Sequence, residues 1–117
     1  PIIEVANFPM NPDTELAVTL EKTAQIVMLE MFKRVMDLFI QGKSISTSQN
    51  NSGLYLTGKE LETMKQILPD TDSDELIDRK IRAFFFPPHT GAFVEVNGKR
   101  FEIINQTILT YLASLKK

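Results

Sequence analysis

The residue type best suited to acid–base chemistry occurs once, as His89. An imidazole titrates near neutral pH, so it can accept or donate a proton during a reaction. A catalytic histidine also needs an orienting carboxylate and a reacting group within hydrogen-bond reach. The segment around it, Pro87-Pro88-His89-Thr90-Gly91, supplies neither. We therefore expect an exposed loop histidine that at most contacts a ligand, and we assign no catalytic residue to this chain.

Metal chemistry is also weakly supported by the residue types. Asp72, Asp74 and Glu75 are a group of carboxylates that could bind a cation. They also stand where a helix is predicted to begin, and acidic side chains there stabilise the helix dipole, so we favour this second explanation. The chain has no cysteine and one histidine, which excludes Cys-based and multi-His zinc sites as well as disulfides. The sequence predicts no metal centre.

A β-hairpin is the element that follows the His89 loop. Asn97-Gly98 separates two runs of alternating apolar residues, and a type I′ turn needs positive φ at both central positions. A two-residue loop fixes the register as Val96 with Lys99, Glu95 with Arg100, Val94 with Phe101 and Phe93 with Glu102. Alternation then predicts one core face and one largely hydrated face. The predicted core face holds Ala92, Val94, Val96, Phe101 and Ile103.

The first part of the chain predicts a short strand and a long helix. Ile2, Ile3, Val5 and Phe8 form a short β-prone run. Residues 15–41 contain neither Gly nor Pro; Asp13 or Thr14 is the predicted N-cap, and Gly42 the C-terminal stop. Two neighbouring apolar stripes run along this helix and imply packing against two bodies. Without one of these bodies Met28, Phe32 and Met36 are expected to be exposed; alternatively, residues 54–117 cover both stripes.

The remaining residues predict a small mixed lobe after a polar linker at residues 43–52. Leu54-Tyr55-Leu56 suggests a strand, and Thr57-Gly58-Lys59-Glu60 matches a capping box. The helix that follows is predicted to point Leu61, Met64, Ile67 and Leu68 inward. Residues 70–73 cap another helix, and Asn105 caps a last one with Ile108, Leu109, Leu112 and Leu115 apolar. The fold class is α+β, with a long N-terminal helix, several short helices and a small antiparallel sheet.

Composition and charge narrow the class of partner. The formal net charge is −2, and binding a polyanion usually needs a concentrated positive patch, so nucleic acid is not expected as a partner. Acidic neighbours weaken the positive potential around the nearest group of basic residues. We therefore interpret these basic residues as a solvated face. No apolar run is long enough to span a membrane, and no signal-peptide pattern begins the chain, so a cytoplasmic location is the prediction. The basic group is Arg79, Lys80, Arg82, Lys99 and Arg100.

Several short motifs together resemble a known family. They are Ile81-Arg82-Ala83, Pro87-Pro88, Gly91-Ala92-Phe93 and Asn97-Gly98-Lys99-Arg100, and at the front Pro1-Ile2-Ile3 followed by Asp13-Thr14 and the long helix. This pattern resembles the C-terminal portion of 10-formyltetrahydrofolate-dependent formyltransferases, the family of methionyl-tRNA formyltransferase and the nucleotide-sugar N-formyltransferases. The similarity covers most of the chain.

The resemblance implies a division of the chain and of the chemistry. Residues 1–42 would be the C-terminal strand and long helix of the catalytic domain, and residues 43–117 an accessory subdomain. The family's catalytic Asn, His and Asp would precede Pro1, as would the domain that binds 10-formyltetrahydrofolate, so we expect a fragment that is inactive alone. Phe86, Pro87 and His89 are the predicted substrate-binding residues, since the family would place substrate near this loop. A homodimer through the long helix or the lobe is a further expectation.

Three functions stay open at this point. A nucleotide-linked amino sugar is favoured as formyl acceptor because the accessory lobe is short and weakly charged for gripping tRNA. A methionyl-tRNA formyltransferase is the alternative within the family. A non-catalytic protein-interaction module is the alternative outside it, because a helix rich in Met and Phe is also typical of adaptable protein-binding surfaces.

Overall fold

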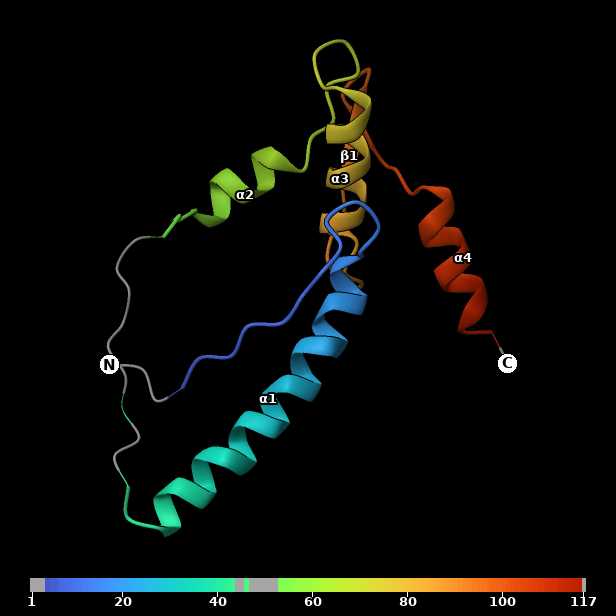
Figure 1. Cartoon of the computed structure of the whole chain (residues 1–117). Coiled ribbons are helices and arrows are strands. Elements are labelled where there is room, and N and C mark those ends of the chain that lie inside the picture. Colours follow the sequence, from blue (N-terminus) through green and yellow to red (C-terminus); the bar gives the residue numbers. More distant parts are fainter. Residues whose placement is uncertain (1–3, 44–45, 47–52, 117) are drawn as a thin grey trace. The chain divides into compact units, whose positions relative to one another are not determined.

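A computed structural model of the chain describes residues 4–43, 46 and 53–116. Figure 1 shows the elements in chain order, from α1 in blue and teal to α4 in red. The α+β class, with a long N-terminal helix and an antiparallel hairpin, is confirmed. The elements are α1 (Ala17–Ile40), α2 (Gly58–Met64), α3 (Asp74–Phe84), β1 (Phe93–Val96), β2 (Lys99–Glu102) and α4 (Gln106–Ser114).

The chain forms two compact units, and α1 contributes to both. The first unit holds residues 1–10 and 21–55, and the second, which we call the lobe, holds residues 11–20 and 56–117. The start of α1 therefore groups with residues that follow it by more than thirty-five positions. Whether residues 1–42 belong to a larger catalytic domain stays a prediction.

Helix α1 begins two residues later than predicted and is capped differently. Neither Asp13 nor Thr14 caps it: the backbone N–H groups of Thr14 and Glu15 donate to the Asn11 carbonyl in a preceding turn. The Thr19 hydroxyl instead accepts from the Leu16 N–H at 3.2 Å and donates to the Leu16 carbonyl at 2.9 Å. The predicted caps are wrong because this turn takes up the backbone groups that the caps would need.

The C-terminal end of α1 is confirmed at Gly42, which has φ +72°. The N–H of Lys43 donates to the Leu38 carbonyl and that of Gly42 to the Phe39 carbonyl, each at 3.0 Å. This pair of bonds is the Schellman motif, which needs a left-handed residue and so favours glycine. The predicted strand before α1 is absent from residues 4–10, and residues 1–3 lie outside the described residues.

Three short helices begin at the predicted caps. Thr57 accepts from the Glu60 N–H at 3.1 Å, and the Glu60 carboxylate accepts from the Thr57 N–H at 2.7 Å, which completes the capping box. The Ser73 hydroxyl caps α3, and the Asn105 side-chain carbonyl caps α4 by accepting from the Ile108 N–H at 3.0 Å. These predictions succeeded because a cap is made by residues within three positions of one another.

The hairpin has the predicted turn and register, but its burial differs from the prediction. Asn97 and Gly98 have φ +52° and +78°, and the four cross-strand pairs are those fixed by the turn. Phe93, predicted on the hydrated face, is 2% exposed, whereas Phe101 on the predicted core face is 50% exposed. Val96 is equally exposed, so the outer half of that face does not belong to the core.

Two contacts explain why Phe93 is buried. The Ile67 N–H donates to the Phe93 carbonyl at 2.7 Å, and the Phe93 N–H donates to the Lys65 carbonyl at 3.1 Å. Residues 65–67 thus pair with the free edge of β1 at its first residue. The guanidinium of Arg100 lies 4.4 Å from the centre of the Phe93 ring and covers its other side. Burial here is set by these neighbours rather than by strand alternation.

Other predicted elements of the lobe are corrected too. Leu54, Tyr55 and Leu56 form no strand and are exposed. Leu61 and Met64 point outward from α2, which is short and has no buried residue. Of the other two residues predicted to point inward after Thr57, Ile67 is buried and Leu68 is exposed. Among the apolar residues of the last helical segment, Ile108 is buried, whereas Leu109, Leu112 and Leu115 are exposed.

The core of the lobe is small and collects residues from distant parts of the chain. Ile108 of α4 is fully buried, and Ile81 comes from α3. Leu16, just before α1, belongs to the same cluster, so residues 11–20 are structurally part of the lobe. The remaining buried members are Ile67 and Ala92, with Val18, Ile77, Phe85, Val94, Ile103 and Tyr111 packed against them.

Candidate functional site

A pocket of about 290 Å³ lies in the lobe, beside the segment that leads out of α3. Phe86, Pro87 and His89, the predicted substrate-binding residues, all line it, so the structure brings the three together. Their role in binding a substrate stays a prediction. The other lining residues are Ile81, Phe85, Pro88, Gly91, Ala92, Glu102, Ile103 and Ile104.

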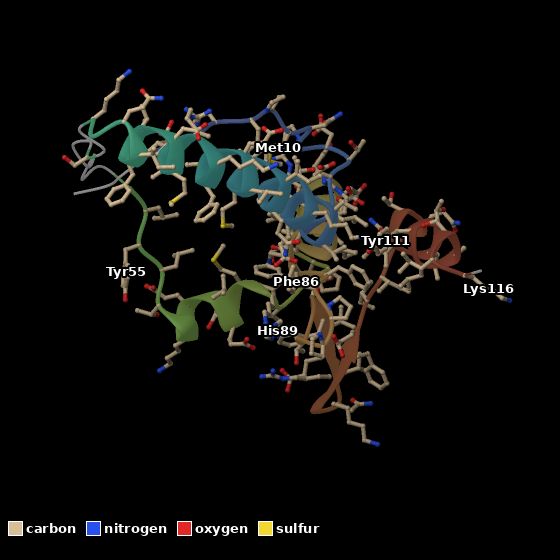
Figure 2. The ribbon with its side chains drawn as sticks, turned by 90° about the horizontal axis from the view of Figure 1, so that it is seen from below. Met10, Tyr55, Phe86, His89, Tyr111 and Lys116 are labelled. Atoms are coloured by element: carbon tan, nitrogen blue, oxygen red, sulfur yellow. The ribbon has the colours of Figure 1, made fainter. Side chains whose placement is uncertain are left out.

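The aromatic–proline segment, residues 85–88, directly follows the end of α3. Phe85 has extended backbone angles and ends the helix, as expected before prolines that cannot continue one. The His89 N–H then donates to the Phe86 carbonyl at 2.9 Å, which turns the chain back. The peptide bond between Pro87 and Pro88 is cis. The Phe86 and His89 rings are stacked, with centroids 6.0 Å apart and planes 29° from parallel (Figure 2).

The floor of the pocket is continuous with the core. Ile81 and Ala92 are buried core residues, and Phe85 packs against the same cluster. The Phe85 ring meets the Tyr111 ring edge-on, with centroids 6.3 Å apart. Edge-to-face aromatic pairs are a favourable arrangement, so this contact holds Phe85 in place. The apolar wall is therefore fixed by packing, whereas Phe86 is half-buried and His89 is exposed.

Glu102 is the lining residue that sequence reasoning missed. Its carboxylate accepts a hydrogen bond from the Gly91 N–H at 2.7 Å and so joins β2 to the loop. The predicted register could have revealed it, because Glu102 is opposite Phe93 and therefore near Gly91, two residues earlier. It supplies the carboxylate that the local sequence around His89 lacks. Among the described residues, however, no hydrogen bond joins Glu102 to the imidazole.

The chemistry available in this pocket is binding rather than proton transfer. It offers an apolar floor, two phenyl rings, one carboxylate and one imidazole. A few polar groups in a mainly apolar cavity fix the orientation of a bound molecule. Among residues 4–43, 46 and 53–116, no three His, Cys, Asp or Glu side chains are placed to hold a metal ion. No described helix is both long and apolar enough to cross a membrane.

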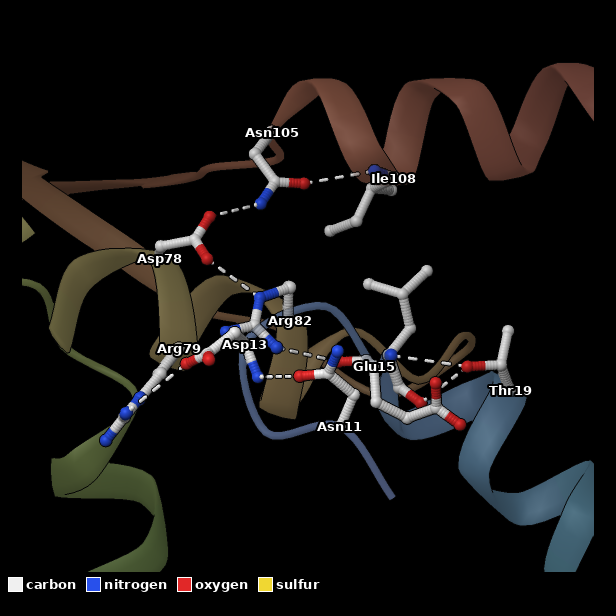
Figure 3. A network of polar contacts seen from close by, with 10 residues as sticks. Asn11, Asp13, Glu15, Thr19, Asp78, Arg79, Arg82, Asn105 and Ile108 are labelled. Carbon is white, nitrogen blue, oxygen red and sulfur yellow. Dashed lines mark hydrogen bonds and ion pairs between the residues drawn. The ribbon is translucent and has the colours of Figure 1, made fainter. Parts of the chain in front are cut away.

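A network of polar contacts in the lobe shows that Arg82, one of the cations predicted to be solvated, is buried. The Arg82 side chain is 5% exposed; its Nε donates to Asp78 Oδ2 at 2.8 Å, and its Nη1 donates to the Glu15 carbonyl at 3.0 Å. Asp78 Oδ1 accepts from the Asn105 amide at 2.8 Å (Figure 3). The hydrogen bond from Arg82 lowers the pKa of Asp78, and that from Asn105 lowers it further. Arg82 is thus a structural cation that joins α3 to residues before α1 and, through Asp78, to α4.

A second, half-buried cation, Lys80, joins α3 to the segment after α2. Lys80 donates to the Gln66 carbonyl at 2.8 Å and to Asp72 Oδ2 at 2.9 Å. The same oxygen accepts from the Leu68 N–H, and this bond, followed by the one from Lys80, lowers the pKa of Asp72. Asp72 is therefore occupied by structural partners. Arg79, Lys99 and Arg100 are exposed, as predicted.

Comparison with known proteins adds no relative: no protein-family model matches this chain, and no curated protein is significantly similar to it. The resemblance to formyltransferases therefore depends on the short motifs named above.

Proposed function

We propose that this chain is the C-terminal portion of a formyltransferase that transfers a formyl group from 10-formyltetrahydrofolate to the amine of a nucleotide-linked amino sugar. The observation that carries the proposal is the pocket of about 290 Å³ on the aromatic–proline segment, which is one of the motifs that resemble the family. In this proposal the pocket receives part of the acceptor substrate.

The composition of the pocket supports a sugar acceptor. The faces of Phe86 and His89 offer apolar surface for the C–H groups of a sugar ring. The Glu102 carboxylate can accept hydrogen bonds from hydroxyl groups or from a protonated amine, and such charge-assisted bonds are about twice as strong as neutral ones. No lysine or arginine is among the described residues that line the pocket, which favours a nucleotide-linked sugar over tRNA.

We propose that the formyl donor binds outside this pocket. Pockets for drug-sized ligands span roughly 300–1,000 Å³, and a reduced folate joins a pterin, a benzoate and a glutamate. The pocket of about 290 Å³ lies at the lower end of that range. We assign no step through the donor to the described residues. Binding of 10-formyltetrahydrofolate and the catalytic Asn, His and Asp are proposed to belong to sequence preceding Pro1.

The test begins with the reading frame of the source gene. An Asn-x-His motif and an Asp-x-Gly motif before the codon for Pro1 are expected. The complete protein is then assayed with 10-formyltetrahydrofolate, separately with nucleotide-linked amino sugars and with methionyl-tRNA, and formylated products are identified by mass spectrometry. Formylation of an amino sugar supports the proposal. Formylation of methionyl-tRNA alone would overturn the choice of acceptor, and absence of the motifs would overturn the family.

The role of the pocket is tested with a matched pair of variants. Phe86→Ala removes a ring that lines the pocket, and Phe101→Ala removes a half-exposed ring outside it. One aromatic contact is worth about 0.5–1.5 kcal/mol, so we expect Phe86→Ala to raise KM for the sugar about two- to tenfold. Phe101→Ala should leave KM unchanged. Equal KM values for Phe86→Ala and the wild type would exclude this pocket as the acceptor site.

A second candidate function has one observation in its favour. Met28 and Phe32 on α1 are each 61% exposed, and Met36 and Phe39 are exposed as well, as predicted for a helix that lacks one of its packing partners. A contiguous apolar surface of this kind is typical of protein-binding sites. The chain would then be a non-catalytic interaction module. A complete reading frame that begins immediately before Pro1 would favour this candidate and exclude the enzyme.

A further inference from the structure

The tip of the hairpin presents an asparagine followed by a glycine in an exposed turn. Asn97 and Gly98 are exposed and both have positive φ. A Cβ atom built on Gly98 would meet no other atom within 4 Å, so the space around this residue is open. Among the described residues the Asn97 carboxamide forms no hydrogen bond. Its side chain is therefore free to rotate toward the following backbone nitrogen.

We propose that Asn97 is a modification site that deamidates spontaneously, without an enzyme. The Gly98 backbone nitrogen loses its proton, attacks Cγ of Asn97 and forms a new C–N bond, while the bond from Cγ to the side-chain nitrogen breaks and that nitrogen takes up a proton and leaves as ammonia. The resulting five-membered succinimide is opened by water. Attack of water at one carbonyl gives aspartate, and attack at the other gives isoaspartate, in which the main chain runs through Cβ. The net change is one water consumed and one ammonia released.

The other described asparagines lack this combination of features. Asn11 precedes Pro12, whose nitrogen carries no hydrogen and cannot form the succinimide in this way, and its Oδ1 accepts from the Asp13 N–H at 3.0 Å. Asn105 is half-buried, and both ends of its carboxamide are bonded, to Asp78 and to the Ile108 N–H. Asn7 is followed by Phe8, whose bulk shields its nitrogen. The structure thus singles out Asn97 among them.

Either product alters the hairpin. Isoaspartate lengthens the main chain by one atom, which a two-residue type I′ turn cannot accommodate without changing the pairing of Val96 with Lys99. Aspartate keeps the backbone but places a negative charge beside Lys99 and Arg100. The reaction therefore changes the charge of the hairpin tip with time, and the isoaspartate product also loosens the closing end of the ladder.

The experiment ages the folded protein in mildly alkaline buffer at physiological temperature and maps deamidation by peptide mass spectrometry. Two hydrogen bonds must break before the Asn105 side chain can react, whereas the Asn97 side chain has none to break. We therefore expect Asn97 to deamidate about tenfold faster than Asn105, or more. Asn97→Gly keeps a turn that favours positive φ and should abolish the time-dependent change in charge. Equal rates at Asn97 and Asn105, or modification confined to Asn7, Asn50 or Asn51, would overturn the proposal.

Discussion

Replacement of Arg82 by methionine should strongly destabilise the lobe. Methionine retains most of the buried stem but removes the bond to Asp78 at 2.8 Å and the bond to the Glu15 carbonyl at 3.0 Å. A hydrogen bond to a charged group contributes about 1.5–3 kcal/mol, and a carbonyl left without its donor costs about 1 kcal/mol. The Asp78 side chain is 46% exposed, so water replaces part of the lost interaction there. We expect a loss of about 2–4 kcal/mol in the free energy of unfolding.

Arg79 provides a matched control on the same helix. Its side chain is 59% exposed, and its ion pair with Asp13, at 3.6 Å, is exposed on both sides. Exposed ion pairs contribute about 0–1 kcal/mol, so Arg79→Met should change stability by less than about 1 kcal/mol. Urea denaturation of the two variants, followed by circular dichroism, measures both losses. If the two substitutions cost the same within error, the structural role assigned to Arg82 is wrong.

The contact between Arg82 and Asp78 also determines how the free energy of unfolding of the lobe changes at acidic pH. Arg82 holds the pKa of Asp78 below its usual range, so the folded chain binds this proton less readily than the unfolded chain. The contribution of Asp78 is therefore complete above the ordinary aspartate pKa of about 3.9 and is lost as the pH falls through the lowered value. Arg82→Met should reduce this acid-dependent loss. Urea denaturation at several acidic pH values measures this loss for the wild type and for Arg82→Met. If the free energy of unfolding falls equally with pH in both, the interaction between Arg82 and Asp78 is contradicted.

Three further outcomes follow from burial and backbone geometry. Ile108→Ala empties a fully buried position and should cost about 2–5 kcal/mol in urea denaturation, while Leu109→Ala, on the exposed side of α4, should cost far less. Gly42→Ala places a Cβ on a residue with φ +72° and should cost about 1–2 kcal/mol by thermal denaturation; no loss would argue against the Schellman motif. Phe32→Ser should reduce any concentration-dependent association seen by analytical ultracentrifugation, and unchanged association would exclude this face of α1 as its cause.

The sequence predicted correctly those features that a few neighbouring residues determine. The Asn97-Gly98 turn and its register depend on two adjacent backbone conformations, and the caps at Thr57, Ser73 and Asn105 each act within three residues. The end of α1 at Gly42 is also local, because it depends on the left-handed conformation of that one residue. Such features need no knowledge of what packs against them.

The features that were missed depend on distant neighbours. Phe93 is buried because residues 65–67 pair with its edge and Arg100 covers its ring, which strand alternation cannot reveal. Arg82 can be buried because the Glu15 carbonyl, 67 residues earlier in the chain, accepts a hydrogen bond from it. Leu61 was predicted inward from periodicity, yet it is 41% exposed.

The candidate site divides in the same way. Phe86, Pro87 and His89 were predicted together because they are adjacent in sequence, and the structure places them on one pocket. Glu102 was missed because it comes from the second strand of the hairpin. Its position was implicit in the register, but only the side-chain bond to the Gly91 N–H shows that it turns toward the pocket.

The placement of Leu16 in the core has a consequence for how the lobe can be isolated. The lobe is discontinuous in sequence: residues 11–20 supply Leu16 to its core and the Glu15 carbonyl to Arg82. This segment acts as a tethered ligand, whose effective concentration is set by the residues that connect it to the rest of the lobe. A protein cut at the polar linker and retaining only residues 43–117 would lose that ligand. Its recovery by an added peptide of residues 11–20 would depend on concentration, whereas in the intact chain the association is intramolecular.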